Sequence, residues 1–353
     1  MILVTQSSCA LSMQDQSTDP NPTYERFQAQ WLGLFDTLII FIGYAESEEE
    51  FSRYADIVFD RLETLHRYYD IYNAYENVNN LYTINANAGI EPVQVGDEII
   101  SLLLRSKEAY NLTYGITNIA MGPVLRIWHE YRAQGLANPQ NAALPPMDSL
   151  LLAGDFAGIS GIVIDTEKST VFLAESGMSI DVGSIAKGYA AQQAIQAAIE
   201  AGAANVLLSA GGHIVTRGIP YGRDLWNVGI QNPDRTHGAP AVIDSILMTN
   251  ATVSISGGYL RYYEVDGQFF GHIIDPATLL PAYRYQMVAA YHPVSWMADI
   301  VSTALFILPI EEGKELAAKT GSQALWMDFD GNFVATQGYI EKSTIINWDE
   351  ENH

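Results

Sequence analysis

The second half of this 353-residue sequence is a succession of short strand-like segments, and this restricts the possible folds more than any other feature. Asp-Gly pairs at 266–267 and 330–331 each separate two such segments, which is the strongest short-range signal for a β-hairpin. Helical segments at 186–201, 296–308 and 311–319 interrupt the strands. Because there is no regular alternation of strand and helix, we predict an α+β fold of mixed sheets with packed helices.

Most of the expected elements can be placed along the chain. Strands are predicted at residues 37–44, 161–165, 171–174, 206–209, 226–230, 243–248, 259–265, 268–274, 287–291, 325–328 and 333–336. Ser47 followed by Glu50 is a capping-box pattern and predicts a helix start, and Gly96 before Asp97 predicts another. We expect a loop at 68–85, which is rich in Tyr and Asn, and a long excursion at 133–149, which contains three prolines.

The N-terminal segment differs from the rest of the chain. Residues 1–30 predict a flexible leader and residues 31–345 a single folded domain. The only cysteine, Cys9, excludes an internal disulfide and a zinc cluster of cysteines. A polar stretch follows Cys9, as in the tether of a lipid-anchored exported protein, but the eight residues before it are too few for a signal peptide. The sequence is compatible with two interpretations of Cys9: a site of lipid attachment, or a cysteine without a role in a disordered arm.

The charge restricts the possible partners. With 18 basic and 41 acidic residues the net charge is −23, which argues against a nucleic-acid partner because cations for phosphate contacts are few. A phosphate-bearing ligand would need local compensation from a metal ion or a helix N-terminus. No stretch approaches the roughly 20 apolar residues of a membrane helix.

Two glycine-containing turns could hold a ligand. In Asp181–Ala190, Gly183 permits a tight turn, and the helix that follows offers free N–H groups near Lys187, so a phosphate could bind there. A plain strand-to-helix turn with a solvated lysine explains this segment equally well. In Leu207–His213, paired glycines allow the backbone to approach a ligand, although a simple β-turn fits too, and His213 reads as a turn residue.

Two further segments carry polar groups that suit catalysis. His272 ends a hairpin strand, where it could reach a cleft and act as a general base near neutral pH, or be satisfied by a neighbouring carbonyl. Asp299 and Thr303 are four residues apart and share one face of an apolar helix. Their oxygens suit Mg²⁺, although a helix-terminal carboxylate with a back-bonded threonine is the simpler alternative.

Taken in order, these segments resemble the FAD:protein FMN transferases, or ApbE-type flavin transferases. The strings that carry the resemblance are DVGSIAKG, SAGGH, SISGGYLR, GHIIDPATLL and ADIVSTA, at 181–188, 209–213, 254–261, 271–280 and 298–304. The match covers about residues 161–308, with a weaker alignment back to Phe35. The resemblance implies a flavin transferase-like (T-fold-like) architecture in which 31–345 form two intimate lobes with FAD in the cleft between them.

The resemblance also implies roles for single residues. His272 would be the catalytic base, and Asp275 would orient its loop. FAD would be held by Phe35, Tyr69, Ile116, Thr117, Asn118, Asp181, Lys187, Arg261 and Ile274. Mg²⁺ would be held by the carbonyl of Ser184 with Asp299 and Thr303, and Ser302 would lie beside them.

Several positions depart from the family pattern. Asn118 stands in place of an aspartate, Leu279 in place of a glycine, and His213 where Asp or Asn is common. Phe35-Asp-Thr37 replaces a Met-Gly-Thr string. These changes affect the flavin and adenine contacts more than the magnesium and His272 strings.

The implied function is Mg²⁺-dependent transfer of FMN from FAD to a Ser or Thr hydroxyl of an acceptor protein, with release of AMP. A FAD pyrophosphatase and a non-catalytic FAD-binding protein are the alternatives. The resemblance implies a place in the bacterial cell envelope, on the extracytoplasmic face of the membrane, with a possible lipid anchor. The chain would act there as a monomer or dimer.

Overall fold

The computed structural model describes residues 24–234, 236–259 and 261–348. Cys9 and most of the predicted leader lie outside these residues. The leader was predicted too long, because Glu25–Gln30 belong to the first strand and pair with the second. Their alternating buried and exposed side chains give this strand one face in the core, and the sequence prediction missed this alternation.

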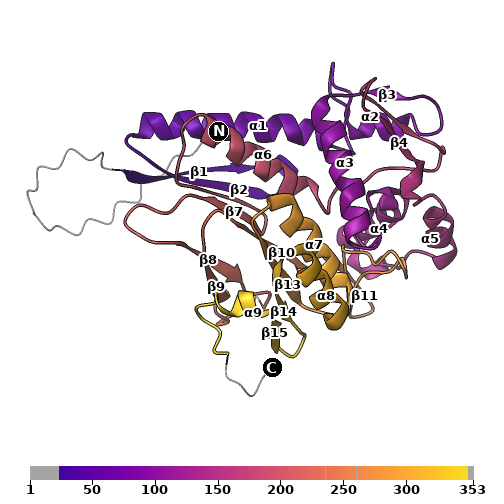
Figure 1. The fold of residues 1–353 in the computed structure, drawn as a ribbon. Helices are drawn as coiled ribbons and strands as arrows, with labels where there is room; N and C mark the ends of the chain where they lie inside the picture. Colours follow the sequence, from indigo (N-terminus) through magenta and orange to yellow (C-terminus); the bar gives the residue numbers. More distant parts are fainter. Residues whose placement is uncertain (1–23, 235, 260, 349–353) are drawn as a thin grey trace, which may run out of the picture.

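An eight-stranded antiparallel sheet forms the centre of the molecule (Figure 1), in the order β1-β2-β6-β7-β10-β13-β14-β15. Its strands are β1 (Glu25–Leu32), β2 (Leu38–Ala45), β6 (Val206–Ala210), β7 (His213–Arg217), β10 (Thr252–Gly257), β13 (Met287–His292), β14 (Gln323–Met327) and β15 (Phe333–Ala335). The two Asp-Gly hairpins are present, one within this sheet as β14–β15. The prediction of an α+β fold is confirmed.

Helices cover one face of this sheet and a small sheet covers the other. The helices are α1 (Glu48–Tyr69), α6 (Ala186–Glu200), α7 (Ser295–Ile307) and α8 (Ile310–Thr320). The opposite face packs against β8 (Trp226–Gln231), β9 (Val242–Met248) and α9 (Gln337–Ile340). Helix α1 begins as predicted, with the Glu50 N–H donating to Ser47 Oγ over 3.2 Å.

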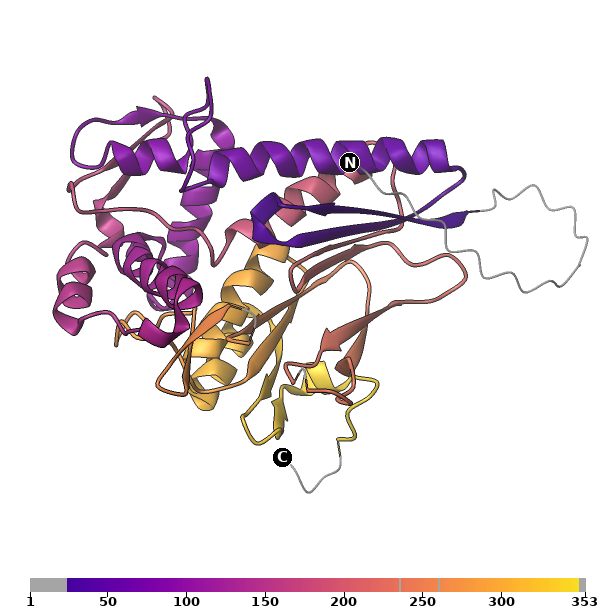
Figure 2. The ribbon, with the colours of Figure 1, turned by 180° about the vertical axis from the view of Figure 1, so that it is seen from behind.

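A second, mainly helical lobe lies beside the end of α1 (Figure 2). It contains α2 (Leu81–Ala86), α3 (Asp97–Leu112), α4 (Gly122–Ala137), α5 (Met147–Gly154), the strands β3 (Val93–Gln94), β4 (Ile162–Asp165) and β5 (Thr170–Leu173), and the hairpin β11 (Tyr262–Val265) and β12 (Gln268–Gly271). Short 3₁₀ turns lie at η1 (Leu34–Asp36), η2 (Ile119–Met121), η3 (Pro139–Asn141) and η4 (Ile159–Gly161).

The sequence prediction missed elements in both lobes. In the central sheet it missed β1, β7 and β10. The predicted loop at 68–85 is partly helical, because Asn80 and Thr83 form a reciprocal capping box at the start of α2. Helix α4 extends into the predicted excursion at 133–149, and α5 begins at its end. Pro123 lies in the first turn of α4, where its missing N–H costs nothing.

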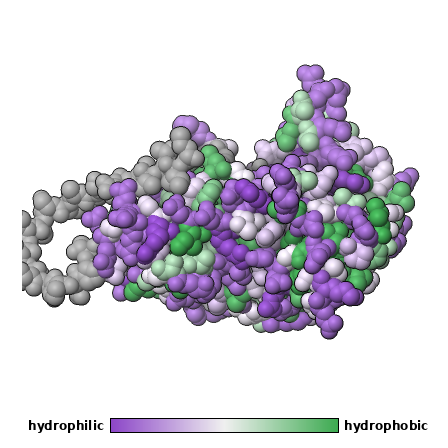
Figure 3. Space-filling view, turned by 90° about the horizontal axis from the view of Figure 1, so that it is seen from above, coloured by the Kyte–Doolittle hydropathy of each residue, from purple (hydrophilic) through white to green (hydrophobic). Residues whose placement is uncertain are grey.

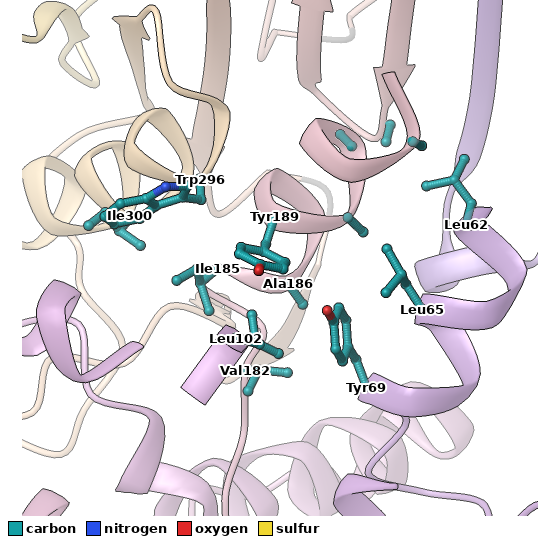
Figure 4. Close-up of a cluster of buried hydrophobic side chains, with 14 of the residues drawn as sticks. Leu62, Leu65, Tyr69, Leu102, Val182, Ile185, Ala186, Tyr189, Trp296 and Ile300 are labelled. Atoms are coloured by element: carbon teal, nitrogen blue, oxygen red, sulfur yellow. The ribbon is translucent and has the colours of Figure 1, made fainter. Parts of the chain in front are cut away.

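The two lobes share a core beside α6. Side chains from α1, α3, α6 and α7 meet there (Figure 4), and the rings of Tyr69 and Tyr189 contact each other edge to face at 6.5 Å. On the face shown in Figure 3, hydrophilic residues predominate and hydrophobic ones form scattered groups. Among the described residues, no helix has the length and apolar character needed to cross a bilayer.

Candidate functional site

A cleft of about 1390 Å³ lies between the sheet with its helices and the helical lobe. All the predicted site residues line it except Asp275 and Ser302. The cleft thus brings together side chains from five separate strings of the sequence. The turn before α6, the face of α7 that carries Asp299 and Thr303, and the end of β12 all contribute to its lining.

Asp299 lines the cleft where α6 and α7 cross. The N–H of Gly188 donates to Asp299 Oδ2 over 2.8 Å, and Ser254 Oγ donates to Oδ1 over 3.2 Å. The ammonium group of Lys187 lies 3.7 Å from Oδ1. A Cβ at position 188 would lie 2.7 Å from the Asp299 Cβ, so the glycine permits the crossing.

The groups around Asp299 fit a hard divalent cation. Asp299, Thr303 and Ser184 all line the same cleft and offer oxygen donors only. Mg²⁺ takes few protein ligands of this kind and completes its shell with water and substrate phosphate. The described part of the chain has no group of three or more His, Cys, Asp or Glu residues placed to hold a metal. A site with a single carboxylate is therefore the kind that this cleft can offer.

Ser302 follows Asp299 in α7 and does not line the cleft. Its side chain is fully buried, with Oγ 2.9 Å from Ser256 Oγ and 2.9 Å from the carbonyl of Asp299. It thus ties α7 to β10. The hydroxyl of Thr303 donates to the same carbonyl over 3.3 Å and keeps its lone pairs on the cleft side.

The turn before α6 is organised by Asp181. Its Oδ1 accepts the N–H of Gly183 over 2.8 Å, an Asx-turn that aims the next residues into the cleft. Burial raises the pKa of Asp181. The hydrogen bond from the Gly183 N–H and the charges of His129 and Lys187 act in the opposite direction and only partly offset this rise. Lys187 in turn reaches the carbonyl of Gly183 at 3.4 Å, so this short segment combines a carboxyl group with a mobile cation.

His272 lies just past the end of β12 and faces the cleft. Burial lowers its pKa to about 3, assisted by the charges of Arg261, Arg132 and Lys187 and opposed by a hydrogen bond to the Arg261 backbone. The Nδ1 atom has no hydrogen-bond partner among the described residues. The ring is therefore neutral at physiological pH and can accept a proton.

Asp275 shapes the loop after His272 and does not line the cleft. Its Oδ1 accepts the N–H of Ala277 over 2.8 Å, and its backbone pairs with Leu280 and Leu279. Leu279 has a φ of +62°, in the left-handed region, and its carbonyl accepts from Trp128 Nε1 over 2.8 Å. Asp275 thus holds a turn next to His272 through its side chain and its backbone, and its catalytic role stays a prediction.

The residues predicted to bind the flavin and adenine have structural contacts of their own. Phe35 has a φ of +52°, and its N–H donates to His66 Nδ1 over 3.3 Å. The hydroxyl of Thr117 is buried and lies 2.7 Å from that of Thr113. Asn118 accepts from the Ala120 N–H and donates to the Ala157 carbonyl, both at 2.9 Å. Ile116 and the Tyr69 ring add apolar surface.

Sequence reasoning missed one wall of the cleft, formed by Tyr72, His129 and Arg132. Tyr72 Oη lies 3.0 Å from His129 Nδ1. Asp70 organises the segment around Tyr72 by accepting four hydrogen bonds from the next five residues. The Tyr- and Asn-rich composition marked this segment as unusual, but only recognition of α4 would have placed His129 and Arg132 beside it.

Comparison with known proteins decides the family. The model of the ApbE family matches residues 40–326, most of the chain. The chain belongs to the ApbE family. The matched range contains all five strings noted in the sequence, which lie between residues 181 and 304.

Two relatives of this chain have the same name. A protein of Treponema pallidum called FAD:protein FMN transferase is 31% identical over 293 residues, 78% of each chain. One of the same name from Haemophilus influenzae is 28% identical over 254 residues, 70% of this chain and 71% of that one.

Solved ApbE structures share the fold. The ApbE protein of Thermotoga maritima matches with a TM-score of 0.77 at 24% identity, over 91% of this chain and 99% of that chain. The apo form of the Pseudomonas stutzeri flavinyl transferase ApbE has a TM-score of 0.74 at 22% identity, over 91% and 96%.

Two departures from the family pattern can now be located. Asn118 uses its amide N–H₂ on the Ala157 carbonyl, a bond that an ionised aspartate could not donate. Leu279 adopts the left-handed conformation that glycine takes without strain, and its side chain contacts the position of Gly154. Asn118 lines the cleft, whereas Leu279 does not.

Proposed function

We propose that this ApbE family member is a FAD:protein FMN transferase. It would transfer the FMN half of FAD to a Ser or Thr hydroxyl of an acceptor protein and release AMP. The observation that carries the proposal is one cleft with a neutral His272 and the oxygen set of Asp299, Thr303 and Ser184. The names of the relatives support the choice of substrate.

The reaction is a phosphoryl-type substitution at the FMN-side phosphorus. The acceptor oxygen forms a bond to that phosphorus, the bridging P–O bond to the AMP phosphate breaks, and the hydroxyl proton must be removed. His272 takes the proton on a ring nitrogen. Its low pKa keeps it free of protons beforehand, and the developing negative charge nearby favours the protonated ring afterwards.

Asp299, Thr303 and Ser184 would hold Mg²⁺ next to the pyrophosphate. When bound, the ion neutralises phosphate charge and stabilises the leaving AMP phosphate. The chain contributes its own positive charge through Lys187, Arg261 and Arg132, all of which line the cleft. These groups supply the local compensation that an anionic ligand needs in a chain of net charge −23.

Flavin fluorescence in a denaturing gel tests this proposal. We expect the chain, FAD, Mg²⁺ and a candidate acceptor domain to yield a fluorescent acceptor band, and an acceptor with its Thr replaced by Ala to yield none. Free FMN with no labelled acceptor would indicate a FAD pyrophosphatase. Bound FAD that stays intact would indicate a binding protein without turnover.

A further inference from the structure

The turn between β1 and β2 has an uncommon backbone conformation where it lines the cleft. Phe35 and Asp36 follow each other in η1, and both have a φ of +52°. The left-handed region is unfavourable for a residue with a Cβ, and for a bulky side chain such as phenylalanine it is an outlier. Such conformations persist only where the surrounding structure fixes them, and they concentrate at ligand sites.

Two contacts from other parts of the chain fix this turn. From α1, His66 Nδ1 accepts the Phe35 N–H over 3.3 Å, and the two rings lie edge to face with centroids 5.4 Å apart. An Nδ1 atom that accepts carries no hydrogen, so the ring hydrogen of His66 lies on Nε2. From the residue just before β11, Arg261 Nη2 donates to the Asp36 carbonyl over 3.2 Å.

The bond from Phe35 to His66 controls more than one N–H group. The turn is closed by the Thr37 N–H, which donates to the Leu34 carbonyl over 3.2 Å, and this leaves the Phe35 N–H to an outside acceptor. Rotation of Phe35 out of the left-handed region would move its own ring and also the Asp36 carbonyl, because both follow that torsion along the chain. The contact with Arg261 would then be lost as well.

We propose that His66 is a positioning residue for FAD, which holds Phe35 and the Asp36–Arg261 contact in the conformation that the substrate meets. The inference rests on the proposed function, because it takes FAD as the occupant of the cleft. Phe35 and Arg261 are among the residues predicted to hold FAD, whereas His66 is not. If the turn adopts this conformation only part of the time, the apparent affinity for FAD falls by that fraction.

Two variants of His66 separate the hydrogen bond from the ring contact. His66→Phe keeps a ring next to Phe35 but offers no acceptor for its N–H. His66→Asn loses the ring, but its amide oxygen can take the place of Nδ1. His292→Phe is the matched control, because His292 Nδ1 also accepts a backbone N–H, that of Val294 over 2.9 Å, and does not line the cleft.

The measurement is the affinity of the full chain for FAD, obtained by fluorescence titration without an acceptor. We expect about 3- to 10-fold weaker binding for His66→Phe, the fold-change that corresponds to the net contribution of one hydrogen bond. We expect His66→Asn and His292→Phe to bind FAD within about twofold of the unaltered chain. If urea unfolding shows that His66→Phe is not folded, His66→Leu takes its place, because it also lacks an acceptor.

Three results would overturn the inference: unchanged affinity in His66→Phe, binding by His66→Asn that is as weak as that of His66→Phe or weaker, or a similar loss in His292→Phe. Weak binding by the Asn variant alone would show that the ring contact is what matters. A set of variants that follows the expected order in a chain that never labels an acceptor would instead contradict the proposed function. The two failures are thus distinguishable.

Discussion

At the scale of single residues, the cleft brings together two groups suited to different tasks. His272 is neutral, and its Nδ1 has no hydrogen-bond partner among the described residues. Asp299 accepts hydrogen bonds from Gly188 and Ser254, and the ammonium group of Lys187 lies nearby. Both could be found from the sequence, because a histidine after a hairpin strand and an Asp-x-x-x-Thr pair on a helix are local patterns. The Tyr72–His129 contact could not, because its two residues are 57 positions apart.

Replacing His272 separates chemistry from binding. We expect His272→Ala to reduce the rate of FMN transfer by about 10²-fold or more, because general-base catalysis contributes about that much, while FAD binding changes little. Single-turnover transfer and fluorescence titration of FAD measure the two quantities. Undiminished transfer in this variant would remove His272 from the mechanism.

Replacing Asp299 tests the cation site. Asp299→Asn keeps the shape of the side chain and an oxygen for the Gly188 N–H, but removes the charge that attracts the cation. We expect the Mg²⁺ concentration for half-maximal transfer to rise by about 10-fold or more. A titration curve that matches the unaltered chain would show that the cation, if one is needed, binds elsewhere.

At the scale of elements, the crossing of α6 and α7 depends on Gly188. A Cβ there would lie 2.7 Å from the Asp299 Cβ and 2.9 Å from the Ser295 carbonyl. We expect Gly188→Ala to lower the free energy of unfolding by about 1–3 kcal/mol through overpacking, and to weaken Mg²⁺ binding as well.

Gly158→Ala is the matched control for this crossing. A Cβ at Gly158 has nothing within 4 Å, and the φ of −76° suits alanine. Urea unfolding should place this variant near the unaltered chain. Equal stability of the two glycine variants would show that the helices can move apart without cost.

The sequence predicts elements well where one local rule dominates. Helix α1 has a capping residue and an acidic first turn, and the predicted strands of the central sheet have apolar runs between turns. Helix α4 was missed because its buried positions, such as Val124 and Trp128, form no clear stripe. Its start at Gly122-Pro123 also lacks a side-chain cap that would signal a helix. The order of strands in the sheet depends on long-range pairing, which no local pattern reports.

At the scale of the whole molecule, four histidines share one electrostatic property. Burial lowers the pKa of His129, His213, His272 and His292. In the unfolded chain these rings titrate near 6.5, so below that pH the unfolded state binds more protons than the folded one. Asp181, whose pKa is raised, acts in the opposite direction but is a single group.

We therefore expect the free energy of unfolding to fall as the pH decreases from 7 to 5. The reason is the loss of the stability that these four neutral histidines confer above their unfolded pKa. Urea unfolding at several pH values in this range measures it. An unchanged or higher midpoint at pH 5 would show that these rings are protonated without cost in the folded chain.

The measurement that tests the central claim most directly follows both products of the reaction. The chain is incubated with FAD, Mg²⁺ and an acceptor domain, and the AMP released is compared with the flavin bound to the acceptor by intact-mass analysis. The transferase account predicts equal amounts of the two, and loss of both with His272→Ala. Release of AMP with FMN free in solution and an unmodified acceptor would contradict it.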